Sequence, residues 1–69
     1  MLTLKFMKQG GGYEMESTTH YSVEGGDPGE LIVSIGDADD FHIGHNSAYS
    51  ACYVMNESGK TIDTIRVRS

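Results

Sequence analysis

The sequence has 69 residues, of which 38% are hydrophobic, and its ten acidic residues outnumber its five Lys and Arg residues. A chain of this length predicts a single domain over residues 1–69 and excludes a two-domain enzyme. The net charge of −5 has the wrong sign for direct binding to nucleic acid. A small core without Trp is marginal by itself, so we expect stabilisation by self-association, a partner or a ligand, and we favour a homo-oligomer.

Cysteine content and hydropathy predict a cytoplasmic protein. Cys52 is the only cysteine and cannot close a disulfide within the chain, which favours a reducing compartment. Residues 1–8 lack the pattern of a secretory signal, and no apolar run approaches the ~20 residues that span a membrane. We therefore expect neither processing nor membrane insertion.

Clusters of Gly separate segments in which polar and apolar residues alternate with a period of two, which is typical of β-strands. Residues 2–8 predict a half-buried strand with Leu2, Leu4 and Phe6 on one face. Residues 13–23 predict either one bent strand or two short ones, because the polar run 17–19 interrupts the apolar face. The segment 27–30 predicts a type II turn with positive φ at Gly29, followed by a strand over 31–35.

The second half of the chain predicts a brief strand over 41–43 and a hairpin between 48–55 and 60–68. Gly59 suits the left-handed position at the end of the hairpin turn. Ile62 and Ile65 are three apart, which predicts a bulge near Asp63 or Thr64. No segment has a helical period. The fold class expected is all-β, with five or six antiparallel strands in a meander or a small open barrel.

Charge is distributed unevenly along the chain. Nine of the ten acidic residues fall between Gln9 and Gly59, a stretch without Lys or Arg. The plain interpretation is a set of solvated turns that keep the protein soluble. The alternative is an acidic surface that docks on a basic groove of another protein. The candidate residues for this surface are Asp37, Asp39, Asp40, Glu14 and Glu16.

The cations lie at the two ends of the chain and would form one stripe if the first and last strands were neighbours. Such a stripe suits a phosphorylated ligand, with cations on the phosphates and a Tyr ring on the base. The candidate residues for this nucleotide site are Lys60, Arg66, Arg68, Tyr49 and Tyr53.

The residue types for a transition-metal site are present in His42, His45 and Cys52, with His20 or an Asp as a fourth ligand. Such a site requires a turn at Gly44 that brings the two histidines together. The alternative is that both histidines are exposed and Cys52 fills the core. We expect no metal and no cofactor. A Cys–His nucleophile pair also needs a cleft, which so short a chain has little material to build, so we expect no enzyme.

Aromatic and methionine side chains follow the apolar face of several segments. Core filling is the expectation for these residues, and a recognition surface is the alternative. They are Tyr13, Tyr21, Tyr49, Tyr53, Met15 and Met55. The segment 48–55 is apolar on both sides, which indicates that one side meets another chain.

The runs Leu4–Tyr13 and Asn56–Asp63 resemble the ends of small uncharacterised proteins encoded by bacteriophages. The resemblance implies a compact accessory protein that blocks or sequesters a host component, and it assigns no functional residue. Our leading hypothesis is therefore a non-enzymatic inhibitor of a host protein in the host cytoplasm, as anti-CRISPR and other anti-defence proteins are. The alternatives are an oligomeric sponge for a nucleotide signal and a structural or assembly module.

Overall fold

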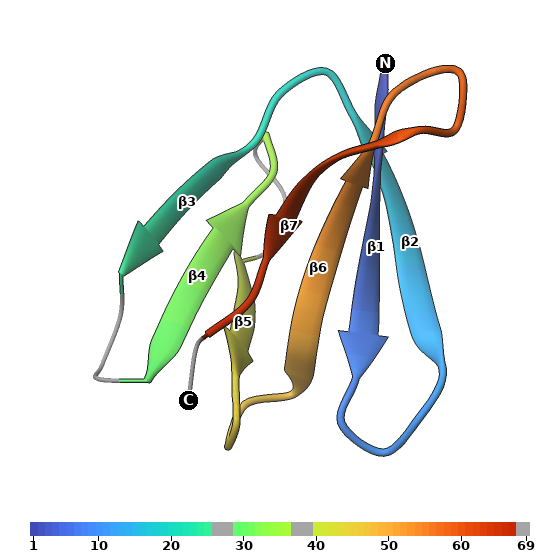
Figure 1. Cartoon of the computed structure of the whole chain (residues 1–69). Coiled ribbons are helices and arrows are strands. Elements are labelled where there is room, and N and C mark those ends of the chain that lie inside the picture. Colours follow the sequence, from blue (N-terminus) through green and yellow to red (C-terminus); the bar gives the residue numbers. More distant parts are fainter. Residues whose placement is uncertain (26–28, 37–39, 68–69) are drawn as a thin grey trace.

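The structure is a computed structural model, and it describes residues 1–25, 29–36 and 40–67. These residues form seven strands and no helix (Figure 1), which confirms the all-β class. No helix of a length and hydropathy suited to crossing a membrane occurs in these ranges. The strands are β1 (Leu2–Lys8), β2 (Tyr13–Thr18), β3 (Ser22–Gly25), β4 (Glu30–Ser34), β5 (Asp40–Gly44), β6 (Tyr49–Met55) and β7 (Thr61–Ile65).

All seven strands belong to one sheet with the order β2-β1-β6-β5-β4-β3, and β7 pairs with β6 beside β5. β5 runs parallel to β6 through the single pair Ile43 and Tyr49, whereas the other pairings are antiparallel. The predicted antiparallel meander of five or six strands is therefore wrong in strand number and in sheet type. Of the two alternatives predicted for residues 13–23, the structure has two separate strands, β2 and β3. β6 lies between β1 and β5. The edges β2 and β3 do not pair with each other in the described residues, so the sheet stays open.

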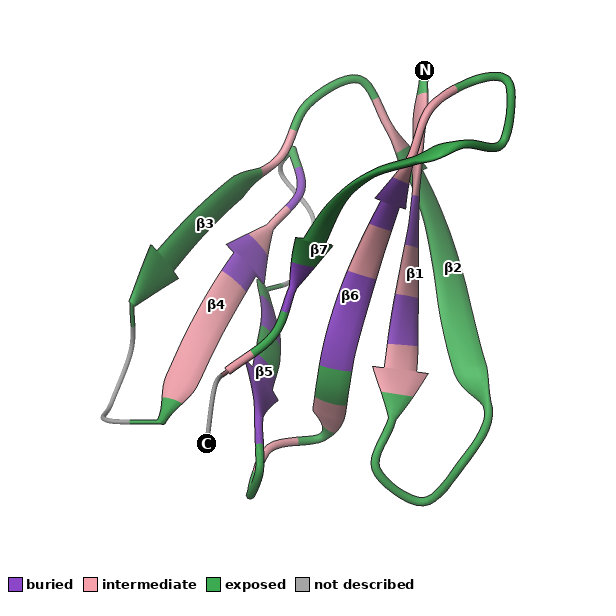
Figure 2. Ribbon diagram, viewed as in Figure 1, coloured by how far each residue is buried: buried purple, intermediate pink, exposed green. Residues whose placement is uncertain are grey.

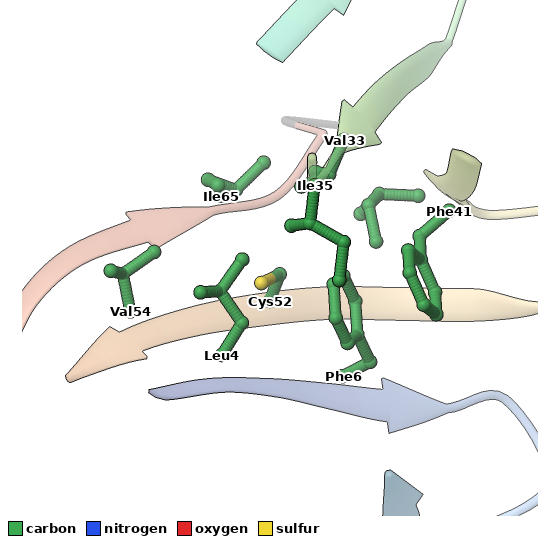
Figure 3. Close-up of a cluster of buried hydrophobic side chains, with 9 residues drawn as sticks. Leu4, Phe6, Val33, Ile35, Phe41, Cys52, Val54 and Ile65 are labelled. Atoms are coloured by element: carbon green, nitrogen blue, oxygen red, sulfur yellow. The ribbon is translucent and has the colours of Figure 1, made fainter. Parts of the chain in front are cut away.

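The core lies on the inner side of this bent sheet, where β4 and β5 fold over β1 and β6 (Figures 2 and 3). Alternation along β1 turns Leu4 and Phe6 inward, and they pair with Val54 and Cys52 of β6. All four are fully buried. The complete buried cluster is Leu4, Phe6, Val33, Ile35, Phe41, Ile43, Cys52, Val54 and Ile65.

Two bulges set which side chains face the core. In β6, Met7 pairs with Ala51 and Lys8 with Tyr49, so Ser50 is an extra residue. The extra residue turns Tyr49 inward, where its ring contacts Phe6. Tyr49 and Tyr53 therefore lie on opposite faces, although regular alternation along the strand would place them on the same face.

The second bulge is in β7, where Val54 pairs with Asp63 and Met55 with Thr61. Ile62 is the extra residue, one position before the predicted Asp63 or Thr64. The turn before β7 follows the prediction, with Gly59 at φ +84°. Gly29 also has φ +84°, as the type II turn requires, while Asp27 and Pro28 of that turn lie outside the described residues.

Candidate binding surface

In the described part of the chain, no strand packs over the outward side of β2, β1, β6 and β7, which we call the open face. Its side chains form a grid across the paired strands, because alternate residues of each strand share one side. Lys5 of β1 occupies the centre, between Met15 of β2 and Tyr53 of β6. The other outward residues of the grid are Thr3, Met7, Tyr13, Ser17, Ala51, Met55, Thr61 and Thr64.

The methionines of the chain gather on the open face. Met7, Met15 and Met55 point outward from three neighbouring strands, and Met1 lies beside Met15 and Met55 at one end. Met15 is 51% exposed, and Tyr13 on the same strand is 53% exposed. All four methionines in the sequence thus lie on this face or at its margin. Flexible, polarisable Met side chains are typical of adaptable binding surfaces.

The alternation of side chains along these strands places Lys5 on the open face and three carboxylates on the inner side of the sheet. Glu14 and Glu16 of β2 pair with Phe6 and Leu4, so their carboxylates lie on the inner side of the sheet. Asp63 of β7 pairs with Val54 and also faces inward. Lys5 faces outward, and its Nζ lies 4.3 Å from the centroid of the Tyr13 ring. The described grid of the open face consequently carries a cation and no carboxylate.

Two hollows lie at opposite ends of the open face. One, of about 480 Å³, is lined by Met1, Met15 and Met55 together with the β6–β7 turn, and we call it the methionine hollow. The other, of about 560 Å³, includes Tyr53 and Arg66, and we call it the arginine hollow. An apolar hollow and a cationic one on the same face give it two distinct anchoring points.

The inward carboxylates are engaged within the molecule. The hydroxyl of Tyr49 donates to Glu14 over 2.6 Å, and Nζ of Lys8 lies 3.3 Å from the same carboxylate. These two contacts hold the pKa of Glu14 below its ordinary value. The hydroxyl of Tyr21 donates to Asp63 over 2.9 Å, and burial together with this carboxylate raises the pKa of Tyr21.

A second group of polar contacts joins β4 and β5 on their outward side. His42 Nδ1 lies 3.0 Å from Glu30, and the Ser47 hydroxyl donates to the same carboxylate over 2.9 Å. The hydrogen bond from His42, followed by that from Ser47, lowers the pKa of Glu30. These contacts hold the loop after β5 against the start of β4.

The acidic residues predicted to bind a partner do not form one surface. Glu14 and Glu16 lie on the inner side of β2, whereas Asp40 pairs with Ser34 on the outward side of β5. β1 and β6 separate the two strands. Asp37 and Asp39 lie outside the described residues. An acidic docking surface therefore remains a prediction from the sequence.

Of the residues predicted to bind a nucleotide, the structure brings Tyr53 and Arg66 together in the arginine hollow. Lys60 lies in the β6–β7 turn, at the far end of β7 from Arg66. Tyr49 is on the inner side with Glu14. Arg68 lies outside the described residues. The first and last strands, β1 and β7, are not neighbours but flank β6 on either side.

The three residues predicted as metal ligands lie in different parts of the fold. His42 contacts Glu30 on the outward side of β5, His45 lines the arginine hollow, and Cys52 is buried in the core. Within the described ranges, no three His, Cys, Asp or Glu side chains come together as a metal site. Burial raises the pKa of the Cys52 thiol to about 12, so the side chain is also unsuited to act as a nucleophile.

Sequence patterns found some residues of this surface and missed others. Tyr13 and Met15 are exposed, so the expectation that they fill the core is wrong, and a recognition surface stays a prediction for them. Their alternation with Glu residues was visible, but alternation cannot tell which side of an edge strand meets the core. No sequence pattern pointed to Gln9 or Ser50, because a turn brings Gln9 and a bulge brings Ser50 to the arginine hollow.

Comparisons with family models, curated proteins and solved structures found no match.

Proposed function

We propose that the protein is a non-enzymatic binding protein that attaches to a partner protein through the open face. The partner segment presents apolar side chains next to carboxylates. The observation that carries the proposal is the gathering of Met7, Met15 and Met55 around Lys5 on the open face, with Met1 at the margin of that face.

The composition of the face supports protein binding over solvation alone. Tyr and Met are enriched at protein interfaces, and the open face combines both with a central Lys. A standard interface covers about 800 Å² on each partner. The whole chain exposes 4505 Å², so an interface of that size would cover roughly a fifth of its surface.

Charge complementarity determines the chemistry of the partner. Lys5 at the centre and Arg66 at one end favour carboxylates opposite them. A second copy docked face to face brings Lys5 near its own equivalent, which is unfavourable. The methionine hollow accepts an apolar side chain of the partner.

Selection of binders from a random-peptide display library tests this proposal even though the partner is unidentified. We expect selected peptides in which Asp or Glu lies beside large apolar residues. Met15→Ser should abolish their binding, and Val23→Ser, at a similarly exposed apolar residue on β3, should not. Selected peptides that lack acidic residues, or that bind both variants equally, contradict the proposal.

A charge-reversal pair tests the electrostatic part. Lys5→Glu should weaken a selected peptide at least about tenfold at low salt, because it places a carboxylate opposite the carboxylates of the peptide. Lys60→Glu makes the same change in net charge at a turn residue that does not line the methionine hollow, and it should leave binding within about twofold. Equal losses in both variants attribute the effect to net charge and overturn the assignment to the open face.

Sedimentation velocity distinguishes a second copy from a foreign partner. The proposal expects the same oligomeric state for the wild type and for Met15→Ser. A wild-type dimer that Met15→Ser converts to a monomer shows that the open face joins two copies, which overturns the proposal in its present form. The phage origin and the inhibition of a host protein remain predictions from the sequence.

A further inference from the structure

The arginine hollow is built by three segments that meet at the beginning of β6. The extra residue Ser50 shifts the register between β1 and β6 at this point, and its hydroxyl donates to the Met7 carbonyl of β1 over 3.4 Å. The backbone N–H of Gln9 donates to the Ala48 carbonyl over 3.2 Å, and the Gln9 side-chain amide donates to the Gly44 carbonyl. These contacts hold the 44–48 loop, and with it His45, against the end of β1.

Arg66 and His45 are the side chains around the hollow that can donate hydrogen bonds to a ligand, and the Tyr53 ring forms a wall. The Ser50 hydroxyl and the Gln9 amide also line the hollow, but they donate to backbone carbonyls of the chain. Among the described residues, no carboxylate lines the hollow, although acidic residues outnumber Lys and Arg two to one in the sequence. Arg66 forms no salt bridge with any residue in the described ranges. Its guanidinium can therefore pair with an external anion.

The volume of the arginine hollow and the Tyr53 ring in its wall indicate the class of ligand. A volume of about 560 Å³ falls within the ~300–1,000 Å³ of small-molecule sites. Guanidinium groups bind phosphate with two parallel hydrogen bonds, and an aromatic ring offers a stacking surface for a planar base. Tyr53 and Arg66 thus supply one contact for each half of a nucleotide.

We propose that the arginine hollow binds a nucleotide, with its phosphate on Arg66 and His45 and its base against Tyr53. The site shares Tyr53 and Arg66 with the open face but requires neither Met15 nor the methionine hollow, so Met15→Ser distinguishes nucleotide binding from partner binding. Among the described residues, the site keeps Tyr53 and Arg66 of those that the sequence predicted for a nucleotide, and it adds Gln9, His45 and Ser50.

Titration of ¹⁵N-labelled protein with adenosine monophosphate tests the site. We expect saturable changes in the amide signals of Gln9, His45, Ser50 and Tyr53. Inorganic phosphate should produce weaker changes at the same positions, and adenosine without phosphate should produce none. Changes that spread over β3 and β4, or that do not saturate at millimolar concentration, overturn the proposal.

Two matched variants separate the site from general electrostatics. Arg66→Ala should weaken adenosine monophosphate binding at least about tenfold, because charge-assisted hydrogen bonds to the phosphate are lost. Lys60→Ala removes the same charge outside the hollow and should have less than a twofold effect.

A third variant tests the contact with the base: Tyr53→Leu should weaken the binding of adenosine monophosphate but not that of inorganic phosphate. Equal effects of Arg66→Ala and Lys60→Ala overturn the proposal, whereas retained binding in Met15→Ser shows that it stands apart from the open-face function.

Discussion

The ring of Phe6 on β1 is stacked on the ring of Phe41 on β5, with centroids 4.0 Å apart and planes inclined by 13° (Figure 3). β1 and β5 are not neighbours in the sheet, since β6 lies between them. Tyr49 adds a third ring, tilted and 5.6 Å from both phenylalanines. This aromatic contact joins the two halves of the bent sheet, β2-β1-β6 and β5-β4-β3. Beside it, β5 and β6 pair through just one pair of residues, Ile43 and Tyr49.

Replacement of Phe41 should therefore separate the two halves. Phe41→Ala is expected to lower the free energy of unfolding by about 3–5 kcal/mol, because it leaves a cavity beside Phe6. Tyr13→Ala removes an exposed ring and should cost no more than about 1 kcal/mol through the lost Lys5 contact. Urea denaturation of both variants measures the difference. Similar losses for both rings contradict a core that depends on the Phe6–Phe41 stack.

Much of the local structure was predictable from the sequence. The strand over Leu2–Lys8 is confirmed with its predicted bounds, and the hairpin of β6 and β7 with its positive-φ Gly59 is confirmed. Both signals are local: alternation fixes the face within a strand, and Gly marks a left-handed turn position.

The pairing of distant strands was not predictable. Nothing local specifies that β6 enters between β1 and β5, because that arrangement depends on which faces meet in the core. The extra residues at the two bulges were also not predictable in their consequences for side-chain orientation. Ser50 turns Tyr49 away from Tyr53 and helps to form the arginine hollow, although alternation places both tyrosines on one side. The sequence thus predicted Tyr53 and Arg66 of the candidate site, whereas Gln9, His45 and Ser50 join it only through the tertiary structure.

Gly44 is expected to be intolerant of any side chain. A Cβ at this position lies 2.6 Å from the backbone carbonyl oxygen of Gly29 and 3.0 Å from Oγ of Ser47. Gly44→Ala should therefore displace the start of β4 and cost about 1–3 kcal/mol. At Gly10, no atom of the described residues lies within 4 Å of the Cβ position, so Gly10→Ala should change stability by less than about 1 kcal/mol. Thermal unfolding of the two variants provides the comparison, and equal melting temperatures contradict the close approach at Gly44.

The hydrogen bond from Tyr49 to Glu14 predicts a pH effect that can be assigned to one residue. This bond is the first cause of the lowered pKa of Glu14, and the contact with Lys8 comes second. A lowered pKa in the folded state stabilises the fold above the unfolded value of 4.5, and the contribution disappears as the pH falls through the folded value. Tyr49→Phe should raise the pKa of Glu14 toward 4.5 in a carbon-detected NMR titration. Tyr53→Phe, on the other face, is the control and should leave it unchanged.

The Cys52 thiol should be unreactive in the folded protein. It is fully buried, and burial raises its pKa to about 12, so almost no thiolate is present near neutral pH. A chromogenic disulfide reagent should modify the native protein slowly and react at once in denaturing urea. Rapid modification without urea shows that the core around Cys52 opens readily and contradicts its close packing.

The same thiol should make the fold sensitive to alkali. The pKa of Cys52 is about 12 in the folded state and 9.0 as its ordinary value, so the unfolded chain loses the proton first as the pH rises. The stabilising contribution is complete below pH 9 and declines between about pH 9 and about pH 12, by up to about 1.4 kcal/mol per pH unit. Tyr21 and Tyr49 also have raised pKa values and act in the same direction. Urea denaturation of wild type and Cys52→Ala across this range isolates the thiol, because both tyrosines remain in the variant. The variant should show the shallower decline, and parallel declines show that Cys52 ionises as readily in the folded state as in the unfolded chain.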